Sequence, residues 1–263
     1  MRRLFVLFWQ YLGQYAKTRL SYKTDFLVAL STSILATVAG YGFVVVLFTR
    51  IPDLRGWSFH EVLFIYGFSL VPLGLFNIVS LNLYEFGDVY VVEGKFDRVL
   101  LRPVHSLFQV LFENFRLESL QEVVTGVAVV AYCSAKLRIE WTLSSLVLFP
   151  ALILCGAVIY VSVFVILSSV NFWFEDRIGI SPPVFNMIAF GRYPITIYNA
   201  AIQFVLSFVI PFAFASFYPT IRFLGRPEFG TEFRLVPLVA TATAAAALGI
   251  WQLGVRQYKS TGS

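Results

Sequence analysis

The sequence has little charge and little polar surface. Only 13% of its 263 residues are charged, whereas 58% are hydrophobic, and the mean hydropathy is +0.77. A soluble globule of this length needs a larger polar fraction to cover its surface. The composition therefore excludes a soluble domain and predicts an integral membrane protein.

Cysteine and histidine are also scarce. Cys133 and Cys155 both fall inside apolar runs, which favours neither a disulfide framework nor a zinc site. His60 and His105 stand at the starts of predicted helices without carboxylate or thiol neighbours at ligand spacing. We expect no metal site in the chain.

Nucleotide-binding and hydrolase motifs are missing. The sequence comes closest to a phosphate-binding loop at Gly94-Lys95, but Gly87 lies too far upstream and Phe96 replaces the Ser or Thr that would bind Mg²⁺. No Gly-x-Ser-x-Gly or His-Glu-x-x-His sequence occurs. The net charge of +5 comes from Lys and Arg at the ends of apolar runs, where these residues anchor spans. We expect no ATPase, cofactor or nucleic-acid site in this chain.

Long apolar runs are abundant, and six of them are long enough to cross a bilayer as helices. They predict an all-α integral membrane fold with six transmembrane helices in a single domain, residues 1–263. The predicted spans are residues 26–48, 62–83, 107–133, 141–170, 195–217 and 235–255. The third of them is predicted as one long helix that begins in the membrane interface.

Local signals mark two helix features. Ser58 and Glu61 have the spacing of a capping box in front of the second span, and Pro72 is expected to kink that span. Residues 1–23 are predicted to form an amphipathic helix that lies in the membrane interface. The apolar run of this segment stops at Gln10 without a cleavage site, so we expect the segment to be retained.

The distribution of Lys and Arg predicts the orientation. Six spans place both termini on one side, and the segments on that side carry twelve Lys and Arg residues against seven on the other side. Cytoplasmic segments are enriched in these residues. We therefore expect both termini, and the charged segment 84–106 between the second and third spans, in the cytoplasm.

Residues 84–106 are the one strongly charged stretch between spans. Acidic and basic residues alternate there with Phe96, Val99 and Leu100, apolar side chains that a solvated loop would not need. The alternative is a solvated loop that merely satisfies the charge rule. We predict a short helix that docks on a partner protein.

Charges inside the third predicted span allow two interpretations. Arg116, Glu118 and Glu122 could form a proton or substrate path, because ionisable residues at membrane depth are often functional. They could also be interfacial ion pairs, which we favour because they lie in the first half of the span. Polar residues such as Asn77 and Gln203 face either a substrate cavity or, more commonly, a neighbouring helix.

Several short motifs resemble those of the permease subunits of type 2 ATP-binding-cassette (ABC) exporters, in particular a bacterial ABC-2 subfamily formerly of unknown function. The motifs are EGKFDRVLLRP at 93–103, GRYP at 191–194, IP at 210–211 with YP at 218–219, and GVRQYKSTG at 254–262. Together with six spans and an interfacial helix, they extend the resemblance over nearly the whole chain.

The resemblance implies an exporter permease of the bacterial cytoplasmic membrane that moves an amphipathic drug-like molecule, a lipid or a lipid-linked compound. It also implies two cytosolic ATPase subunits, which bind ATP and Mg²⁺, and a second permease chain that is identical or paralogous. The implied ATPase-coupling residues are Glu93, Lys95, Phe96, Asp97, Arg98 and Arg102. The implied substrate-path residues are Tyr41, Tyr66, Phe76, Asn77, Gln203 and Phe208.

Two other functions remain as alternatives. A membrane-embedded enzyme would use Arg116, Glu118 and Glu122 and would turn over without an ATPase partner. A passive channel or scaffold subunit would conduct or assemble independently of ATP.

Overall fold

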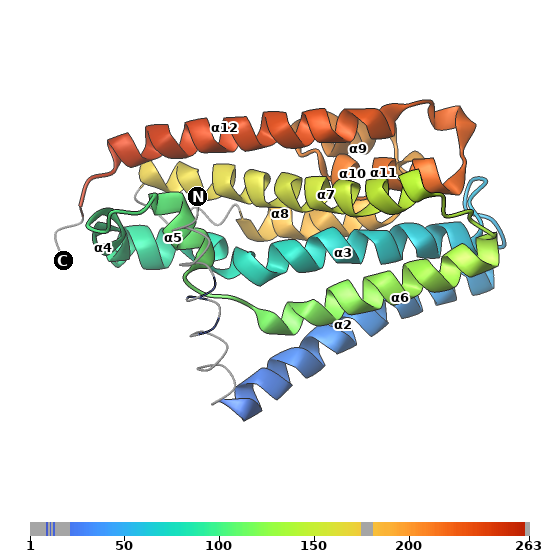
Figure 1. The fold of residues 1–263 in the computed structure, drawn as a ribbon, viewed down its shortest axis with the longest axis horizontal. Coiled ribbons are helices and arrows are strands. Elements are labelled where there is room, and N and C mark those ends of the chain that lie inside the picture. The colour runs from blue at the N-terminus through green and yellow to red at the C-terminus, as the bar shows by residue number, and fades with distance from the viewer. Residues whose placement is uncertain (1–8, 10, 12, 14–21, 175–180, 261–263) are drawn as a thin grey trace.

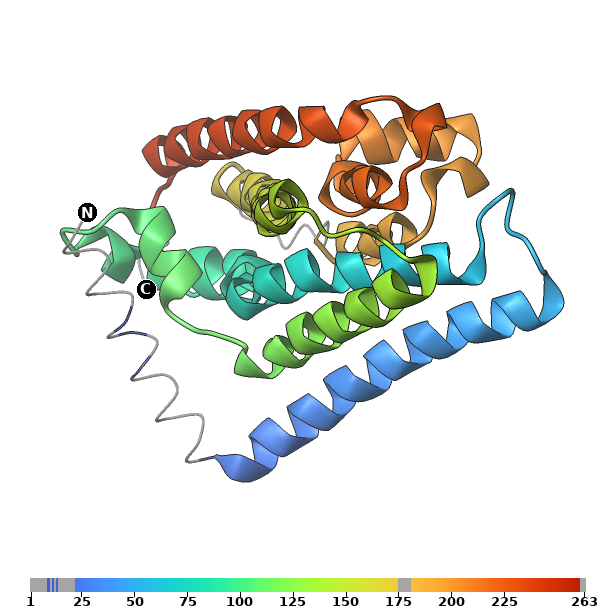
Figure 2. The same cartoon turned by 45° about the vertical axis from the view of Figure 1, so that its right-hand side comes forward.

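The computed structural model describes residues 22–174 and 181–260, together with Trp9, Tyr11 and Gly13. Figures 1 and 2 show it from two directions. These residues are mostly helical and contain no strand. The predicted interfacial helix, residues 1–23, lies almost entirely outside the described residues.

In the part of the chain that the structure describes, five helices are long and apolar enough to cross a membrane, so the chain is a multi-pass membrane protein. They are α2 (Lys23–Arg50), α3 (Phe59–Tyr84), α6 (Leu120–Leu137), α7 (Leu143–Ser169) and α12 (Val236–Gln257). Four of the six predicted spans coincide with α2, α3, α7 and α12. The remaining two predicted spans differ from the structure and are described below.

Helix α3 forms the centre of the bundle. Helices α6 and α7 pack along it, α12 covers α7, and α2 lies on the outside at an angle to the others (Figures 1 and 2). The side chains of Phe64, Phe68 and Phe76 on α3 are completely buried. Helix α3 also carries the polar side chains of Ser69, Asn77 and Asn82, which are buried and would be costly to expose to lipid, and this favours its central position.

Glycines allow the central helices to approach closely. A Cβ atom added to Gly126 of α6 would lie 2.6 Å from the carbonyl oxygen of Gly67 on α3. A Cβ added to Gly156 of α7 would lie 3.1 Å from Cβ of Pro72. Close backbone approach at small residues is a principal means of packing helices inside membranes, where burial from water contributes little.

The predicted start of α3 is confirmed. The backbone N–H and the hydroxyl of Ser58 both donate to Oε2 of Glu61, at 2.9 and 2.7 Å. The carboxylate thereby satisfies a backbone donor that the first helical turn leaves free. Pro72 lies inside α3, as the sequence predicts.

The segment predicted as one helix at 107–133 is divided in the structure. It contains α5 (Ser106–Phe112), a non-helical turn, a 3₁₀ turn (Leu117–Ser119) and then α6. In the turn, the amide of Asn114 donates to Oδ1 of Asn82 at 2.8 Å, and the N–H of Arg116 donates to the carbonyl of Ile78 at 2.9 Å. The bond from the N–H of Arg116 takes the place of a helical one, and the side-chain bond of Asn114 fixes the turn to α3, which accounts for the break in the helix.

The predicted span at 195–217 is also not a continuous helix. The region consists of α8 (Ser181–Met187), 3₁₀ turns at Ile188–Arg192 and Ile195–Ile197, α9 (Ala200–Phe204), a π-helix (Val205–Val209), α10 (Phe212–Ala215) and α11 (Phe217–Leu224). Oδ1 of Asn199 accepts from the N–H of Ile202 at 2.9 Å and so starts a new helix at Ala200. Pro211 has no N–H to continue the following turn. Helices α9, α10 and α11 gather near the α2–α3 connection (Figure 1).

An ion pair joins two segments at that end of the bundle. Arg226 donates from Nε to Oε1 of Glu61 at 2.7 Å and from Nη2 to Oε2 at 2.8 Å. Its Nη2 also donates to the carbonyl of Gly56 at 2.6 Å, and its guanidinium lies 4.6 Å from the ring centroid of Trp57. The start of α3 is thereby fixed to the segment that follows α11.

Candidate functional site

The charged segment 84–106, called the tip below, is a folded structure at the opposite end of the bundle (Figure 1). It contains a π-helix (Phe86–Val92) and the short helix α4 (Lys95–Leu100). Gly94 between them has a φ of 70°, a left-handed conformation that glycine adopts without a steric cost. The predicted short helix is therefore present, and a sharp glycine turn sets its direction.

Aromatic rings anchor the tip to the bundle. The ring of Phe96 is fully buried and lies 5.7 Å from Phe86, 5.0 Å from Phe172 and 5.0 Å from Tyr258, between ring centroids. Trp251 of α12 joins the same cluster and donates from Nε1 to Oγ of Ser106 at 3.0 Å. Phe96, predicted to be a coupling residue, is buried inside the chain and holds α4 in place instead of being available to a partner.

Two other predicted coupling residues make contacts within the chain. Nζ of Lys95 lies 3.3 Å from Oε2 of Glu113 and 4.8 Å from the ring centroid of Tyr90. Asp97 accepts from Oγ of Ser260 at 2.6 Å, close to Tyr258. Lys95 ties α4 to the end of α5, and Asp97 ties it to the C-terminal segment.

The other three predicted coupling residues, Glu93, Arg98 and Arg102, are exposed. Between them lies Leu101, with 84% of its surface exposed, and beside it Leu100 is also exposed. The prediction missed the outward position of these two leucines. The spacing of Phe96 and Val99 places both on the inner face of α4, and this period could have indicated that Leu101 points outward.

A polar group links α3, α6 and α2 inside the bundle. The amide of Asn77 donates to Oε2 of Glu122 at 2.7 Å. The amide of Gln121 donates to Oγ of Ser33 at 2.8 Å and to Oγ1 of Thr37 at 3.1 Å. Oδ1 of Asn77 is buried and has no hydrogen-bond partner in the described part of the chain. This carbonyl is an open acceptor at membrane depth.

The three charges of the third predicted span do not form one cluster. Arg116 pairs with Glu118 across 3.7 Å, and the side chain of Glu118 is only 3% exposed. Glu122, in the first turn of α6, instead binds Asn77 of α3. The structure therefore has two separate interactions here. One is an ion pair at the start of α6, and the other is a hydrogen bond between α6 and α3.

The predicted path residues occupy three different environments. Tyr66 and Phe76 are buried: Tyr66 donates to the carbonyl of Thr37 at 2.8 Å, and the ring of Phe76 lies 4.8 Å from that of Phe164, between centroids. Gln203 donates to the carbonyl of Tyr198 at 2.9 Å. Two others, Tyr41 on α2 and Phe208 beyond α9, are exposed. Tyr66 and Phe76 thus lie inside the bundle, whereas Tyr41 and Phe208 lie on its outside.

Groups of metal ligands are absent from the described residues, because no three His, Cys, Asp or Glu side chains there lie close enough to hold an ion. Cys133 is buried and Cys155 is half-buried, and neither forms a disulfide.

Comparison with known proteins gives one result. A family model described as ABC-2 family transporter protein matches residues 34–262. The matched range extends from α2 through the tip and α12 to the C-terminal segment. No curated protein and no solved structure matches the chain.

Proposed function

Because the chain belongs to the ABC-2 family of transporter proteins, we propose that it is the permease subunit of an ATP-driven exporter. The family makes it a membrane transport component and implies association with ABC ATPase subunits. The proposed substrate is an amphipathic drug-like molecule, a lipid or a lipid-linked compound. ATP and Mg²⁺ bind on the ATPase subunits.

The observation that carries this proposal is the outward surface of the tip. Leu101 stands exposed between Arg98 and Arg102, whereas the inner face of the same segment is buried in an aromatic cluster. An apolar side chain flanked by charges is typical of a protein-binding surface. We propose that this surface faces the cytosol and docks on an ATPase subunit.

The anchoring of the tip explains how a partner could move the spans. The tip follows α3 directly through the π-helix, and Phe96 packs on Trp251 of α12. Lys95 holds it to the end of α5. A force applied at Leu101 would therefore act on α3 and α12 as rigid elements, which is how a switch between two access states could be driven.

The exposure of α2 supports a second permease chain, identical or paralogous, beside this one. Thr37 and Val44 are the buried residues that the structure describes in α2, although the helix is apolar along its length. Gln121, next to Glu122 on α6, donates hydrogen bonds to Ser33 and Thr37 of α2, and Tyr41 is exposed on the same helix. We propose that the substrate path runs along α2, with the carbonyl of Asn77 and the ring of Tyr41 in contact with it.

The test places a negative charge on the docking surface, at Leu101 or at Arg98. Leu101→Glu and Arg98→Glu should each lower both the retention of co-purified ATPase subunits and the substrate-stimulated ATPase rate. The matched control is Arg222→Glu, an exposed cation on α11 at the opposite end. Each variant should show an unchanged melting temperature.

Other outcomes would separate the remaining functions. ATPase retention and coupling that survive both tip variants would contradict the docking surface. Ion flux in liposomes that ignores ATP would favour a passive channel. Turnover by the purified chain alone would favour an enzyme, although Arg116 and Glu122 have different partners in the structure.

A further inference from the structure

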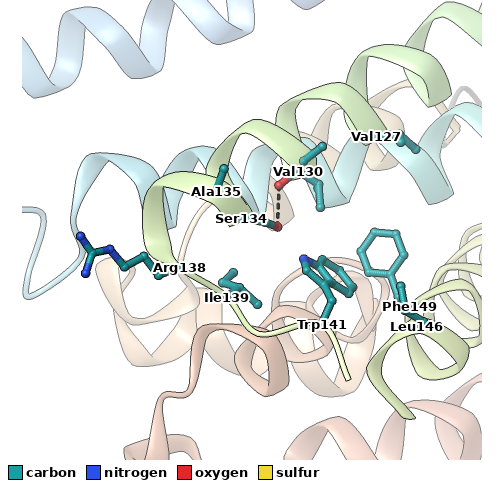
Figure 3. Close-up of a pocket in the computed structure, with 10 residues that line it drawn as sticks. Val127, Val130, Ser134, Ala135, Arg138, Ile139, Trp141, Leu146 and Phe149 are labelled. Atoms are coloured by element: carbon teal, nitrogen blue, oxygen red, sulfur yellow. Dashed lines mark hydrogen bonds between the residues drawn. The ribbon is translucent and has the colours of Figure 1, made fainter. Parts of the chain in front are cut away.

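A groove lies between α6 and α7 at the end where the two helices connect. Its volume is about 650 Å³, and its walls are almost entirely apolar. Figure 3 shows Val127 and Val130 of α6 on one side, Leu146 and Phe149 of α7 on the other, and Trp141 of the connection between them.

The packing of the bundle explains why the groove exists. Helices α6 and α7 are consecutive and both pack against α3. The wall formed by α6 carries the small side chains of Ala131, Ser134 and Ala135. The hydroxyl of Ser134 donates to the carbonyl of Val130 at 2.7 Å, so its polar atom is satisfied inside the helix. The groove therefore offers an apolar ligand a dry surface.

The length of the groove matches one leaflet of a bilayer. Val127 and Arg138 both line it, and eleven residues of helix span about 16 Å. The hydrocarbon core of a bilayer is about 30 Å thick. Trp141 lines the groove near the connection of α6 and α7, and tryptophan is enriched at the ends of membrane spans. Leu146, which lines the groove, is itself 55% exposed, so lipid can enter from the membrane.

A cation stands at the polar end of the groove. Arg138 is exposed, and Figure 3 shows its guanidinium extending beyond the end of α6. It has a φ of 54°, in a C-cap position where glycine or asparagine is usual. Arg138 therefore places a long cationic side chain at a left-handed backbone position that usually carries glycine.

The neighbouring charges leave this end positive. Lys136 is exposed and lies near Tyr132. Glu140 lines a separate hollow together with Leu137 and Phe223. Arg138 borders this hollow as well. Glu61 lines that same hollow, and its carboxylate is paired with the guanidinium of Arg226.

We propose that the groove binds one anionic phospholipid, with an acyl chain between α6 and α7 and the phosphate beside Arg138. Chain length, apolar lining and cation placement all match this ligand. The site is separate from the tip and from the polar group at Asn77, so it does not depend on the proposed transport function.

The test uses the fluorescence of Trp141 in the full-length chain reconstituted in liposomes. Phosphatidylglycerol or phosphatidylcholine with brominated acyl chains quenches a tryptophan that it touches. The contribution of Trp141 is the difference between the unmodified chain and Trp141→Phe. Brominated phosphatidylglycerol should bind this site about fivefold more tightly than phosphatidylcholine, the preference expected from one arginine at a membrane surface.

Substitutions test separately where the phosphate and the acyl chain of the lipid bind. Arg138→Gln should abolish the preference for phosphatidylglycerol and keep the quenching, whereas Lys136→Gln should keep both. Ala131→Phe, at an exposed position, should fill the groove and remove quenching by either lipid. Ala135→Phe repeats that test at a second exposed position.

Several results would overturn the proposal. Equal binding of the two lipids by the unmodified chain would remove the anionic preference. A preference that Lys136→Gln abolishes as fully as Arg138→Gln would place the phosphate elsewhere. Quenching that survives Ala131→Phe and Ala135→Phe, or no quenching at all because a second chain covers the groove, would show that lipid does not occupy it.

Discussion

The two ends of the bundle are anchored by different interactions. At the tip, the aromatic cluster around Phe96 provides the anchoring, and Arg98 and Arg102 remain exposed around Leu101. At the opposite end, the charges anchor: Arg226 binds Glu61 through two hydrogen bonds. The two ends therefore differ in their main anchor: aromatic packing holds the tip, with the Lys95–Glu113 contact beside it, whereas a two-point ion pair holds the start of α3.

The largest effect is expected from removing the aromatic ring that anchors the tip. Phe96→Ala should destabilise the chain by about 4 kcal/mol, because a completely buried phenylalanine leaves a cavity when truncated. The measurement is the free energy of unfolding in mixed detergent micelles. The control within the same segment is Leu101→Ala, whose side chain is largely exposed and whose effect should stay within about 0.5 kcal/mol.

Equal effects of these two substitutions would contradict the assignment of an inner and an outer face to α4. It would mean that the tip is loosely held and that Phe96 is as accessible as Leu101.

The second test removes the anchor of the opposite end. Glu61→Gln should cost about 3 kcal/mol of unfolding free energy, because it leaves the partly buried guanidinium of Arg226 with the half-exposed Glu228 as its carboxylate partner. The side chains of Glu61 and Arg226 are only 13% and 24% exposed. Glu228→Gln is the matched control: its carboxylate lies 3.1 Å from Arg226 but is half exposed, so its loss should cost about 0.5 kcal/mol.

A double substitution sharpens this result. Glu61→Gln combined with Arg226→Gln should cost less than the sum of the single effects, because the two side chains act on each other directly. Strict additivity would show that Glu61 contributes mainly as the cap of α3, through Ser58.

Most of the fold was predictable because the apolar runs are long. Helices α2, α3, α7 and α12 follow from continuous hydrophobic stretches, whose length alone requires a span. The break between α5 and α6 was not predictable, because it depends on the pairing of Asn114 with Asn82 across the bundle. The short helices around Pro211 were missed because their combined hydrophobicity resembles that of one span.

The candidate site was predictable in position and only partly in detail. Charge interleaved with apolar residues located the tip, and Glu93, Arg98 and Arg102 are exposed there as a docking role requires. The inward direction of Phe96 follows from partners at Phe172 and Tyr258, which are distant in the sequence. No local pattern around Phe96 contains that information.

The smallest expected effect concerns the C-terminal segment, which closes the aromatic cluster. Burial, with the nearby charge of Asp97 adding to it, raises the pKa of Tyr258 to about 12. A raised pKa means that folding favours the neutral phenol. The resulting stabilisation is complete below the pKa of an unfolded tyrosine, about 10, and is lost as the pH rises through 12.

This shift can be measured by the absorbance of tyrosinate during an alkaline titration, as the difference between the unmodified chain and Tyr258→Phe. Asp97→Asn should lower the pKa of Tyr258 but leave it above that of a free tyrosine, because burial is the larger cause. Arg98→Gln, which alters an exposed neighbour of Asp97, is the control for a general change in surface charge. If Tyr258 titrates near pH 10 while the chain is folded, its ring is in water, and the C-terminal segment does not pack on Phe96. The tip would then lose one side of its anchor, and the contrast between the two ends would rest on α12 and Phe172 alone.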